Sequence, residues 1–318
     1  MKIIDAHMHF SKIASFRECA LRDSGLEYTE SGYMAEAGAC GIVRSVCMGL
    51  YESKADGFPD SKAETPMCAD LSGGLPPGVD LCLGINPHTL TDAAIDRMED
   101  MIAHGIDGRG SATGSPAGGL SGGDAGRGSC GSYGSPRNGA PGSKIAGIKI
   151  YAGYYHYDVN DPIYAPAYDF AEKHGLAVAI HSGDTYSERG KLIYSQPLSV
   201  DSLAVDRPDM RIVICHMGAP WLYDACEVAG KNKNVYMDLS GLYVGDKAYF
   251  EAAAKKPLLL DRYRQALVVM DKYDKVLFGT DWPLAPMESY VNFCKQLVPP
   301  ETYDKVFYEN AVKVFNIE

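Results

Sequence analysis

The sequence predicts an α/β fold, a distorted (β/α)8 TIM barrel forming one domain. Eight short apolar, β-branched runs recur along the chain, and amphipathic stretches lie between most of them. Histidine and aspartate residues follow several of these runs directly. One such barrel commonly needs about 250 residues, so the 318 residues of this chain accommodate a barrel together with an insertion.

The eight runs are near-continuously apolar, which is typical of parallel strands covered on both faces. The predicted strands are Lys2–Asp5, Ile42–Met48, Val79–Ile85, Ala146–Tyr151, Ala177–Ile180, Arg211–Cys215, Val235–Leu239 and Lys275–Gly279. The predicted helices between them include Asp92–Ala103, Pro162–Lys173, Trp221–Ala229 and Leu258–Lys272. An open doubly wound sheet would carry a glycine-rich turn after its first strand, where this chain has His7-Met8-His9 instead.

Residues 105–143 break this alternation of strands and helices. This segment of 39 residues contains 14 glycines and 7 serines and has almost no aliphatic side chains. Such a composition cannot bury enough apolar surface to offset the entropy lost on ordering, so disorder is expected. Two origins remain open: a flexible lid, or a reading-frame error that replaced an ordinary helix before the fourth strand.

Composition restricts the class of protein. A net charge of −11 argues against nucleic acid as a partner, and it says little else about the kind of partner. The nine cysteines form no CxxC pair, and neither a signal peptide nor an apolar run of about 20 residues is apparent. The sequence therefore predicts a reduced cytoplasmic protein without a membrane partner, and it leaves open whether the chain forms a homo-oligomer.

His7 and His9 stand at the end of the first predicted strand. Residues two apart in a strand point to the same side and lie roughly 6.5 Å apart along the chain. Two imidazoles in this arrangement can bind one cation. The pattern is weak by itself, because two ordinary polar histidines would give the same spacing.

Three further residues follow apolar strands: His181, His216 and Asp281. An uncompensated carboxylate such as Asp281 would be costly beside a buried strand, so it must be paired or bound. The carboxyl ends of all barrel strands meet on one face, where active sites lie. Three or more imidazoles and a carboxylate suit zinc or a similar divalent transition metal, so the sequence predicts a metal centre.

At this point the sequence resembles the amidohydrolase superfamily, in particular its amidohydrolase-related branch, which includes aminocarboxymuconate-semialdehyde decarboxylase. The resemblance rests on DAHMHF, GIKIYAGYY, AIHSGDT, VICHMGAPW, NVYMDLSG, LFGTDWP and ENAVKVF. It implies a distorted barrel with one or two divalent ions, most simply zinc, with manganese as an alternative. The implied metal ligands are His7, His9, His181 and Asp281. In such enzymes the histidine matching His216 acts on water or substrate, or binds the second metal.

Lys149 lies in GIKIYAG at the end of the fourth predicted strand. Relatives with two metals often carry a carboxylated lysine there, and KIYAG resembles the KLYP stretch of dihydroorotases. An ordinary ammonium that binds a substrate carboxylate is the alternative, and the sequence does not decide between the two.

The resemblance leaves three functions open. The first is hydrolysis of a small amide, lactone or ester, in which Asp281 transfers the proton and His216 steadies the oxyanion. The second is non-oxidative decarboxylation of a small carboxylic acid, and the third is ligand binding without catalysis. Substrate-binding candidates near the strand ends are Tyr151, Tyr154, His156 and Trp282.

Overall fold

The computed structural model describes residues 1–10, 14–49, 75–106 and 143–317. The predicted disordered segment, residues 105–143, therefore lies almost entirely outside the described residues. Its first two residues are described, and Gly105 ends the preceding helix with a φ of 81°. A glycine adopts this φ without the steric cost that a side chain would bring.

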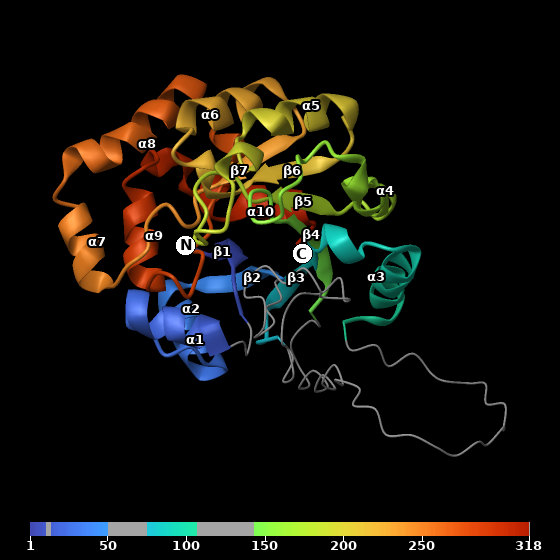
Figure 1. The fold of residues 1–318 in the computed structure, drawn as a ribbon. Helices are drawn as coiled ribbons and strands as arrows, with labels where there is room; N and C mark the ends of the chain where they lie inside the picture. Colours follow the sequence, from blue (N-terminus) through green and yellow to red (C-terminus); the bar gives the residue numbers. More distant parts are fainter. Residues whose placement is uncertain (11–13, 50–74, 107–142, 318) are drawn as a thin grey trace, which may run out of the picture.

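The described strands form one parallel sheet in the order β1 to β8, as in a (β/α)8 barrel (Figure 1). Each strand pairs with the next one along the chain, and this confirms the predicted fold class. The strands are β1 Ile3–Met8, β2 Ile42–Met48, β3 Val79–Ile85, β4 Ile145–Ile150, β5 Ala177–Ile180, β6 Arg211–Ile214, β7 Val235–Asp238 and β8 Val276–Leu277.

The seam between β8 and β1 is an irregular part of the barrel. Strand β8 has only two residues, whereas the sequence predicted Lys275–Gly279. Backbone hydrogen bonds still join the two segments, because Ala6 N donates to Phe278 O at 2.9 Å and Asp281 N donates to His7 O at 2.8 Å. The second of these bonds brings Asp281 against the first histidine of the predicted metal centre.

Helices surround the sheet and connect successive strands (Figure 1). The four predicted helices are present as α3 Asp92–His104, α4 Ala165–Lys173, α6 Leu222–Lys231 and α8 Pro257–Met270; the expected start of α4 is a 3₁₀ turn, Pro162–Tyr164. The other α-helices of the described chain are α1 Ala14–Cys19, α2 Glu30–Cys40, α5 Leu198–Asp206, α7 Lys247–Ala253, α9 Met287–Lys295 and α10 Asn310–Phe315.

The barrel interior is filled by small and medium side chains. Alternate strand residues such as Ile4, Ala146, Ala179 and Val213 form one buried cluster together with residues of α10, including Phe315. Because successive strand residues point to opposite faces, the other residues of these strands pack outward against the helices in a separate, larger cluster. The interior of the described barrel is therefore a packed core.

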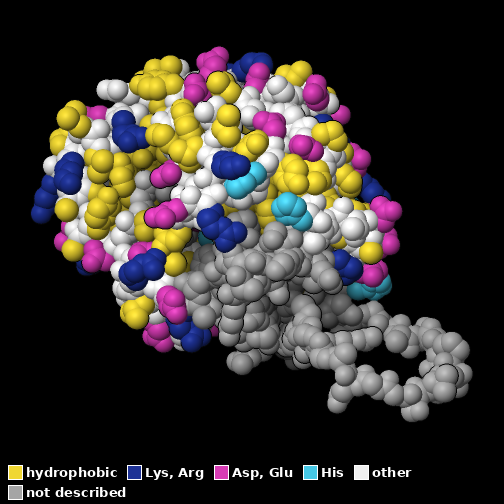
Figure 2. Space-filling view, in the orientation of Figure 1, with side chains coloured by type: hydrophobic (Ala, Val, Ile, Leu, Met, Phe, Trp, Pro, Cys, Tyr) yellow, Lys and Arg dark blue, Asp and Glu magenta, His cyan; other side chains and the backbone are white. Residues whose placement is uncertain are grey.

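The surface drawn in Figure 2 carries both signs of charge. Lys and Arg side chains alternate with Asp and Glu side chains over the described part of this face, and they do not merge into a continuous basic surface there. In the described ranges, none of the helices combines the length and apolar character that crossing a membrane requires.

Candidate metal centre

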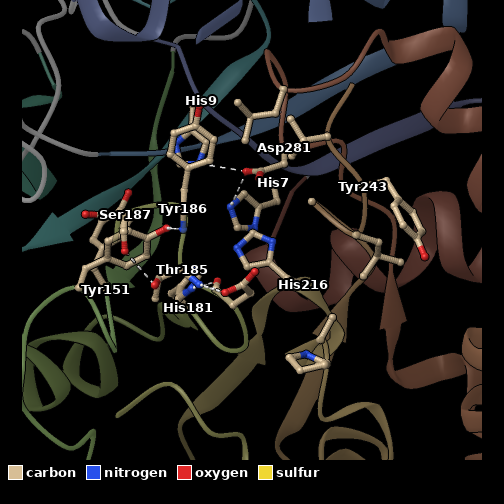
Figure 3. A pocket seen from close by; sticks show the side chains of 18 of the residues that line it. His7, His9, Tyr151, His181, Thr185, Tyr186, Ser187, His216, Tyr243 and Asp281 are labelled. Atoms are coloured by element: carbon tan, nitrogen blue, oxygen red, sulfur yellow. Dashed lines mark hydrogen bonds and ion pairs between the residues drawn. The ribbon is translucent and has the colours of Figure 1, made fainter. Parts of the chain in front are cut away.

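Residues from four strand ends meet at the carboxyl end of the barrel (Figure 3). His7 lies within β1 and His9 just after it, His181 follows β5, His216 follows β6, and Asp281 follows β8. The ring centroids of His7 and His9 are 5.4 Å apart, those of His7 and His216 are 4.8 Å apart, and those of His216 and His181 are 4.8 Å apart. The structure thus brings together all five residues that the sequence singled out.

Each of the four imidazoles has one ring nitrogen beside a group that can only accept a hydrogen bond. His7 Nδ1 lies 2.9 Å from Asp238 Oδ2, and His9 Nδ1 lies 3.0 Å from Met48 O. His181 Nε2 lies 2.9 Å from Asp184 O, and His216 Nδ1 lies 3.1 Å from Ser240 O. These nitrogens therefore carry the ring protons, so in the neutral form the other nitrogen of each ring bears a lone pair.

Burial keeps three of these rings neutral. It lowers the pKa of His7 to about 3, and the nearby Lys149 adds to this effect. Burial, with His216 and Lys149 as neighbours, holds the pKa of His181 well below its ordinary value, and burial also lowers the pKa of His216. Neutral imidazoles are the form that binds a metal, so the rings are ready as ligands without losing a proton.

Asp281 supplies the anionic oxygen of the group. Burial raises the pKa of this carboxyl, but its interactions with His9, His216 and His7 outweigh burial and hold the pKa well below its ordinary value. Its Oδ1 lies 3.1 Å from His9 Nε2 and 3.4 Å from His7 Nε2. Neither Asp281 Oδ1 nor His7 Nε2 makes a hydrogen bond within the described part of the chain, although both atoms are buried.

These separations fit a shared metal ion. Ligand atoms about 2.0–2.1 Å from a tetrahedral zinc ion lie about 3.3 Å from each other. The distances from Asp281 Oδ1 to the two Nε2 atoms are close to this value. Buried lone pairs that face a carboxylate oxygen without a hydrogen bond would repel it, and a cation between them would remove this repulsion. The residues present therefore fit the predicted metal.

Among the described residues, two groups of side chains could each bind a metal, because the donor atoms within each group all lie within 4.8 Å of one another. The first group is His7, His9 and Asp281, and the second is His7, His216 and Asp238. His181 belongs to neither group, although its ring is adjacent to that of His216. Its assignment as a fourth ligand, like the assignments of His7, His9 and Asp281, remains a prediction.

Asp238 and Ser240 are site residues that the sequence analysis did not single out. Asp238 is the last residue of β7, and its carboxylate contacts both His7 and the backbone of His216. Ser240 Oγ lies 3.0 Å from His216 Nδ1. The signal was available, because Asp238 follows an apolar strand in NVYMDLSG in the same way that Asp281 follows one in LFGTDWP.

The backbone adopts left-handed conformations at two of these positions. His216 has a φ of 58° and Asp281 a φ of 59°. Residues with side chains rarely adopt such values, and the strain of order 1–3 kcal/mol persists where the surrounding structure enforces it. Strained residues at two strand ends of one site are typical of a functional centre.

A cavity of about 850 Å³ opens above the histidines. Tyr151 and Tyr154, two of the predicted substrate-binding residues, line it, whereas His156 lines a separate cavity of about 330 Å³. Trp282 does not line the large cavity: its side chain is completely buried and packs between Phe10, Tyr28 and Tyr33. The structure therefore gives Trp282 a place in the core, because the residue after Asp281 turns inward beneath the site.

Lys149 also lines the large cavity, although its side chain is only 1% exposed. Its Nζ donates to Cys215 Sγ at 2.9 Å and lies 5.4 Å from the centre of the Tyr151 ring. Burial raises the pKa of the Cys215 thiol, which is therefore neutral. Within the described residues Lys149 has no carboxylate at ion-pair distance, so its position suits either a carbamate or an anion-binding ammonium.

Solved structures with the same fold include three proteins that match this chain over nearly its whole length. An uncharacterized TIM-barrel protein from Bordetella bronchiseptica is 19% identical, with 99% of each chain covered and a TM-score of 0.62. A probable 2-pyrone-4,6-dicarboxylic acid hydrolase from Acinetobacter baumannii is 15% identical, with 100% of each chain covered and a TM-score of 0.58. The 5-carboxyvanillate decarboxylase from Sphingomonas paucimobilis is 14% identical, covers 100% of this chain and 99% of its own, and has a TM-score of 0.58.

At these identities the solved structures establish the fold alone, and no curated protein sequence matches the chain. The family model described as amidohydrolase matches residues 139–317, which is more than half of the 318 residues. This range contains His181, His216, Asp238 and Asp281, and the barrel seam brings His7 to them. The chain therefore belongs to the amidohydrolase family.

Proposed function

We propose that this chain is a metal-dependent hydrolase that acts on a small amide, lactone or ester. The observation that carries the proposal is a cluster of four imidazoles, each with one N–H directed at an acceptor, in which His7 and His9 contact the buried carboxylate of Asp281. Such a donor set is costly to bury unless a cation joins it. We infer that His7, His9, His181 and Asp281 hold one divalent transition metal ion, most simply zinc, with manganese as the alternative.

A bound divalent ion would polarise a substrate carbonyl and lower the pKa of water to roughly 7. The chain's own residues would then move the protons and hold the substrate. Asp281 would act as the carboxylate that takes a proton from water through its second oxygen, Oδ2, and passes it to the leaving group. His216 lies beside His7, with ring centroids 4.8 Å apart, where it can steady charge on the reacting oxygen.

Non-oxidative decarboxylation is the second candidate, and Lys149 favours it. If Lys149 is an ammonium, it lines the cavity without a carboxylate partner in the described structure and would suit a substrate that brings its own carboxylate. If Lys149 is instead carboxylated, its two anionic oxygens would help hold a second ion, with His216 as a further ligand. The chemical state of Lys149 therefore bears on both the reaction and the number of metal ions.

A substrate panel tests the proposed reaction. The metal-loaded protein is offered small lactones, esters and amides, and in parallel aromatic and aliphatic carboxylic acids, while acid release and CO₂ are recorded separately. Acid release without CO₂ supports the hydrolase. CO₂ release from a carboxylic acid supports the decarboxylase instead, and Lys149→Gln should then raise KM more than it lowers kcat. Saturable binding of panel members without turnover would point to a binding protein.

A further inference from the structure

Both carboxylate oxygens of Asp238 accept hydrogen bonds in the described structure. Oδ2 accepts from His7 Nδ1 at 2.9 Å. Oδ1 accepts from His216 N at 2.9 Å, from Ser240 N at 3.0 Å and from Ser240 Oγ at 2.5 Å. The side chain is completely buried. One carboxylate thus joins β7 to the histidines at the ends of β1 and β6.

We propose that Asp238 is a positioning residue that presents His7 Nε2 to the metal and holds His216 beside it. This inference rests on the proposed metal-dependent function. It gives Asp238 no contact with metal or substrate, because Oδ1 is taken by three donors and Oδ2 faces His7 Nδ1, not the Nε2 that faces Asp281. The short distances within the group His7, His216 and Asp238 therefore reflect hydrogen bonding and not a second ligand set.

The effect on His7 follows from the chemistry of a carboxylate. An ionised carboxylate only accepts hydrogen bonds, and the three donors on Asp238 Oδ1, two of them backbone amides, stabilise this form. His7 must therefore carry its proton on Nδ1 and a lone pair on Nε2. The opposite tautomer would set a lone pair against an anion at 2.9 Å in a buried site, where repulsion is strong.

The effect on His216 is exerted through the backbone. His216 has a φ of 58°, which a side-chain-bearing residue rarely adopts, and its amide is held by Asp238 Oδ1. The same oxygen holds Ser240, whose carbonyl oxygen and hydroxyl lie 3.1 Å and 3.0 Å from His216 Nδ1. Asp238 therefore supports both the strained turn at His216 and the contacts that orient its ring.

Asp238→Asn separates the effect on the His7 tautomer from the support of the His216 backbone. The asparagine oxygen will remain at the Oδ1 position, since a turned amide would face three donors there instead of one. Its NH₂ group then points at His7 Nδ1, which must become an acceptor, and the proton moves to Nε2. We expect zinc affinity to fall about 10- to 100-fold, the usual effect of losing such a partner of a ligand histidine.

The matched control is Asp5→Asn. Asp5 is equally buried and also contacts His7, but through the backbone amide, with Asp5 Oδ1 3.2 Å from His7 N. Its other contacts are with Thr280, whose hydroxyl can rotate to accept from an amide. This variant should keep the His7 tautomer and a zinc affinity close to that of the wild type.

The experiment has two readouts. Nitrogen-15 NMR of selectively labelled histidines in the metal-free protein reports which nitrogen of His7 is protonated, and His7→Gln assigns the signal. Competition with a chelating dye reports zinc affinity for the wild type and both variants. A proton on Nδ1 in the wild type, on Nε2 in Asp238→Asn and on Nδ1 in Asp5→Asn, with zinc affinity lost only in Asp238→Asn, supports the proposal.

Other outcomes overturn it. A wild-type His7 protonated on Nε2 contradicts the proposal without any variant, so an insoluble Asp238→Asn still leaves it falsifiable. An Asp238→Asn protein with unchanged tautomer and zinc affinity contradicts it as well. The wild type could also show the expected His7 tautomer and yet bind neither zinc nor manganese. This result would support the positioning of His7 and overturn the proposed metal-dependent function. Failure of the positioning role and failure of the proposed function are therefore distinguishable.

Discussion

His7 Nε2 and Asp281 Oδ1 face each other at 3.4 Å across the seam between β1 and β8, and neither atom makes a hydrogen bond in the described structure. A lone pair opposite a carboxylate oxygen in a buried site is unfavourable until a cation lies between them. This relationship links the barrel's irregular closure to its chemistry, because the backbone bond from Asp281 N to His7 O places the two side chains together.

The first prediction concerns the metal. Gently purified protein should contain a divalent transition metal, measured by elemental analysis, and His7→Ala combined with His9→Ala should abolish its binding. The barrel should remain folded by circular dichroism, because the packed interior cluster around Ile4 and Val213 does not include these histidines. Zinc at 100 times its Kd should stabilise the wild type by about 2.7 kcal/mol and leave the double variant unaffected. A folded wild type that takes up neither zinc nor manganese contradicts the prediction.

The second prediction concerns proton transfer. Asp281→Asn should lower kcat by about 10²- to 10⁴-fold on a confirmed substrate, because an amide is a poor proton acceptor and a weaker metal ligand. His216→Asn should lower kcat more than it raises KM. Asp274→Asn is the control, since Asp274 is exposed and precedes β8 at the opposite end of the barrel, and it should leave kcat unchanged. Near wild-type turnover in both site variants would contradict these roles.

The third prediction uses Gly241, which lines the cavity with a φ of 59°. A Cβ at this position would lie 2.7 Å from both Asp281 Oδ2 and His216 Nδ1. Gly241→Ala should therefore displace these two side chains and lower both zinc affinity and kcat, measured by dye competition and turnover. Gly175→Ala is the control, because Gly175 has a φ of 60° and a Cβ added there would meet open space, with no neighbouring side chain or backbone within 4 Å in the described structure.

The control variant should lose about 1–2 kcal/mol of unfolding free energy from the left-handed backbone alone. Its zinc affinity and kcat should be unchanged. Equal losses of zinc affinity in the two variants would mean that the backbone conformation, and not the contact with Asp281 and His216, decides the outcome.

The fourth prediction addresses Lys149. If the lysine is carboxylated, the wild type should bind two metal ions per chain, and Lys149→Ala should bind one. Short carboxylic acids added to the variant should then restore part of the second site. If the lysine is an ammonium, wild type and variant should bind the same single ion, and the variant should instead bind carboxylic acids more weakly. Metal counting by elemental analysis and a carboxylate titration separate the two states.

The fifth prediction concerns residues 105–143, whose composition cannot support a packed core. Replacement of this segment by a short helical connector should leave the metal content unchanged and raise the unfolding midpoint, measured by thermal denaturation. None of the proposed ligands lies in it, and the family match begins at residue 139, near its end. Loss of the metal on replacement would mean that the segment contributes to the site.

The sequence by itself determined the barrel and most of its site. A strand can be predicted from a short apolar run, which is a local feature of the sequence, and β2, β3 and β5 have the predicted bounds. Parallel barrel strands end on one face, and this rule was sufficient to bring His7, His9, His181, His216 and Asp281 together from distant parts of the chain.

Tertiary structure decided the features that depend on the direction of a side chain or on contacts between strands. Trp282 follows a predicted ligand, yet its ring turns into the core, because side-chain direction at a strained strand end is set by packing. Strand β8 has only two residues, and backbone hydrogen bonds from Ala6 N to Phe278 O and from Asp281 N to His7 O join the segment after it to β1. The role of Asp238 arises only when β7 lies beside β6 and its carboxylate reaches both His7 and His216, a coincidence of three strands that no local pattern encodes.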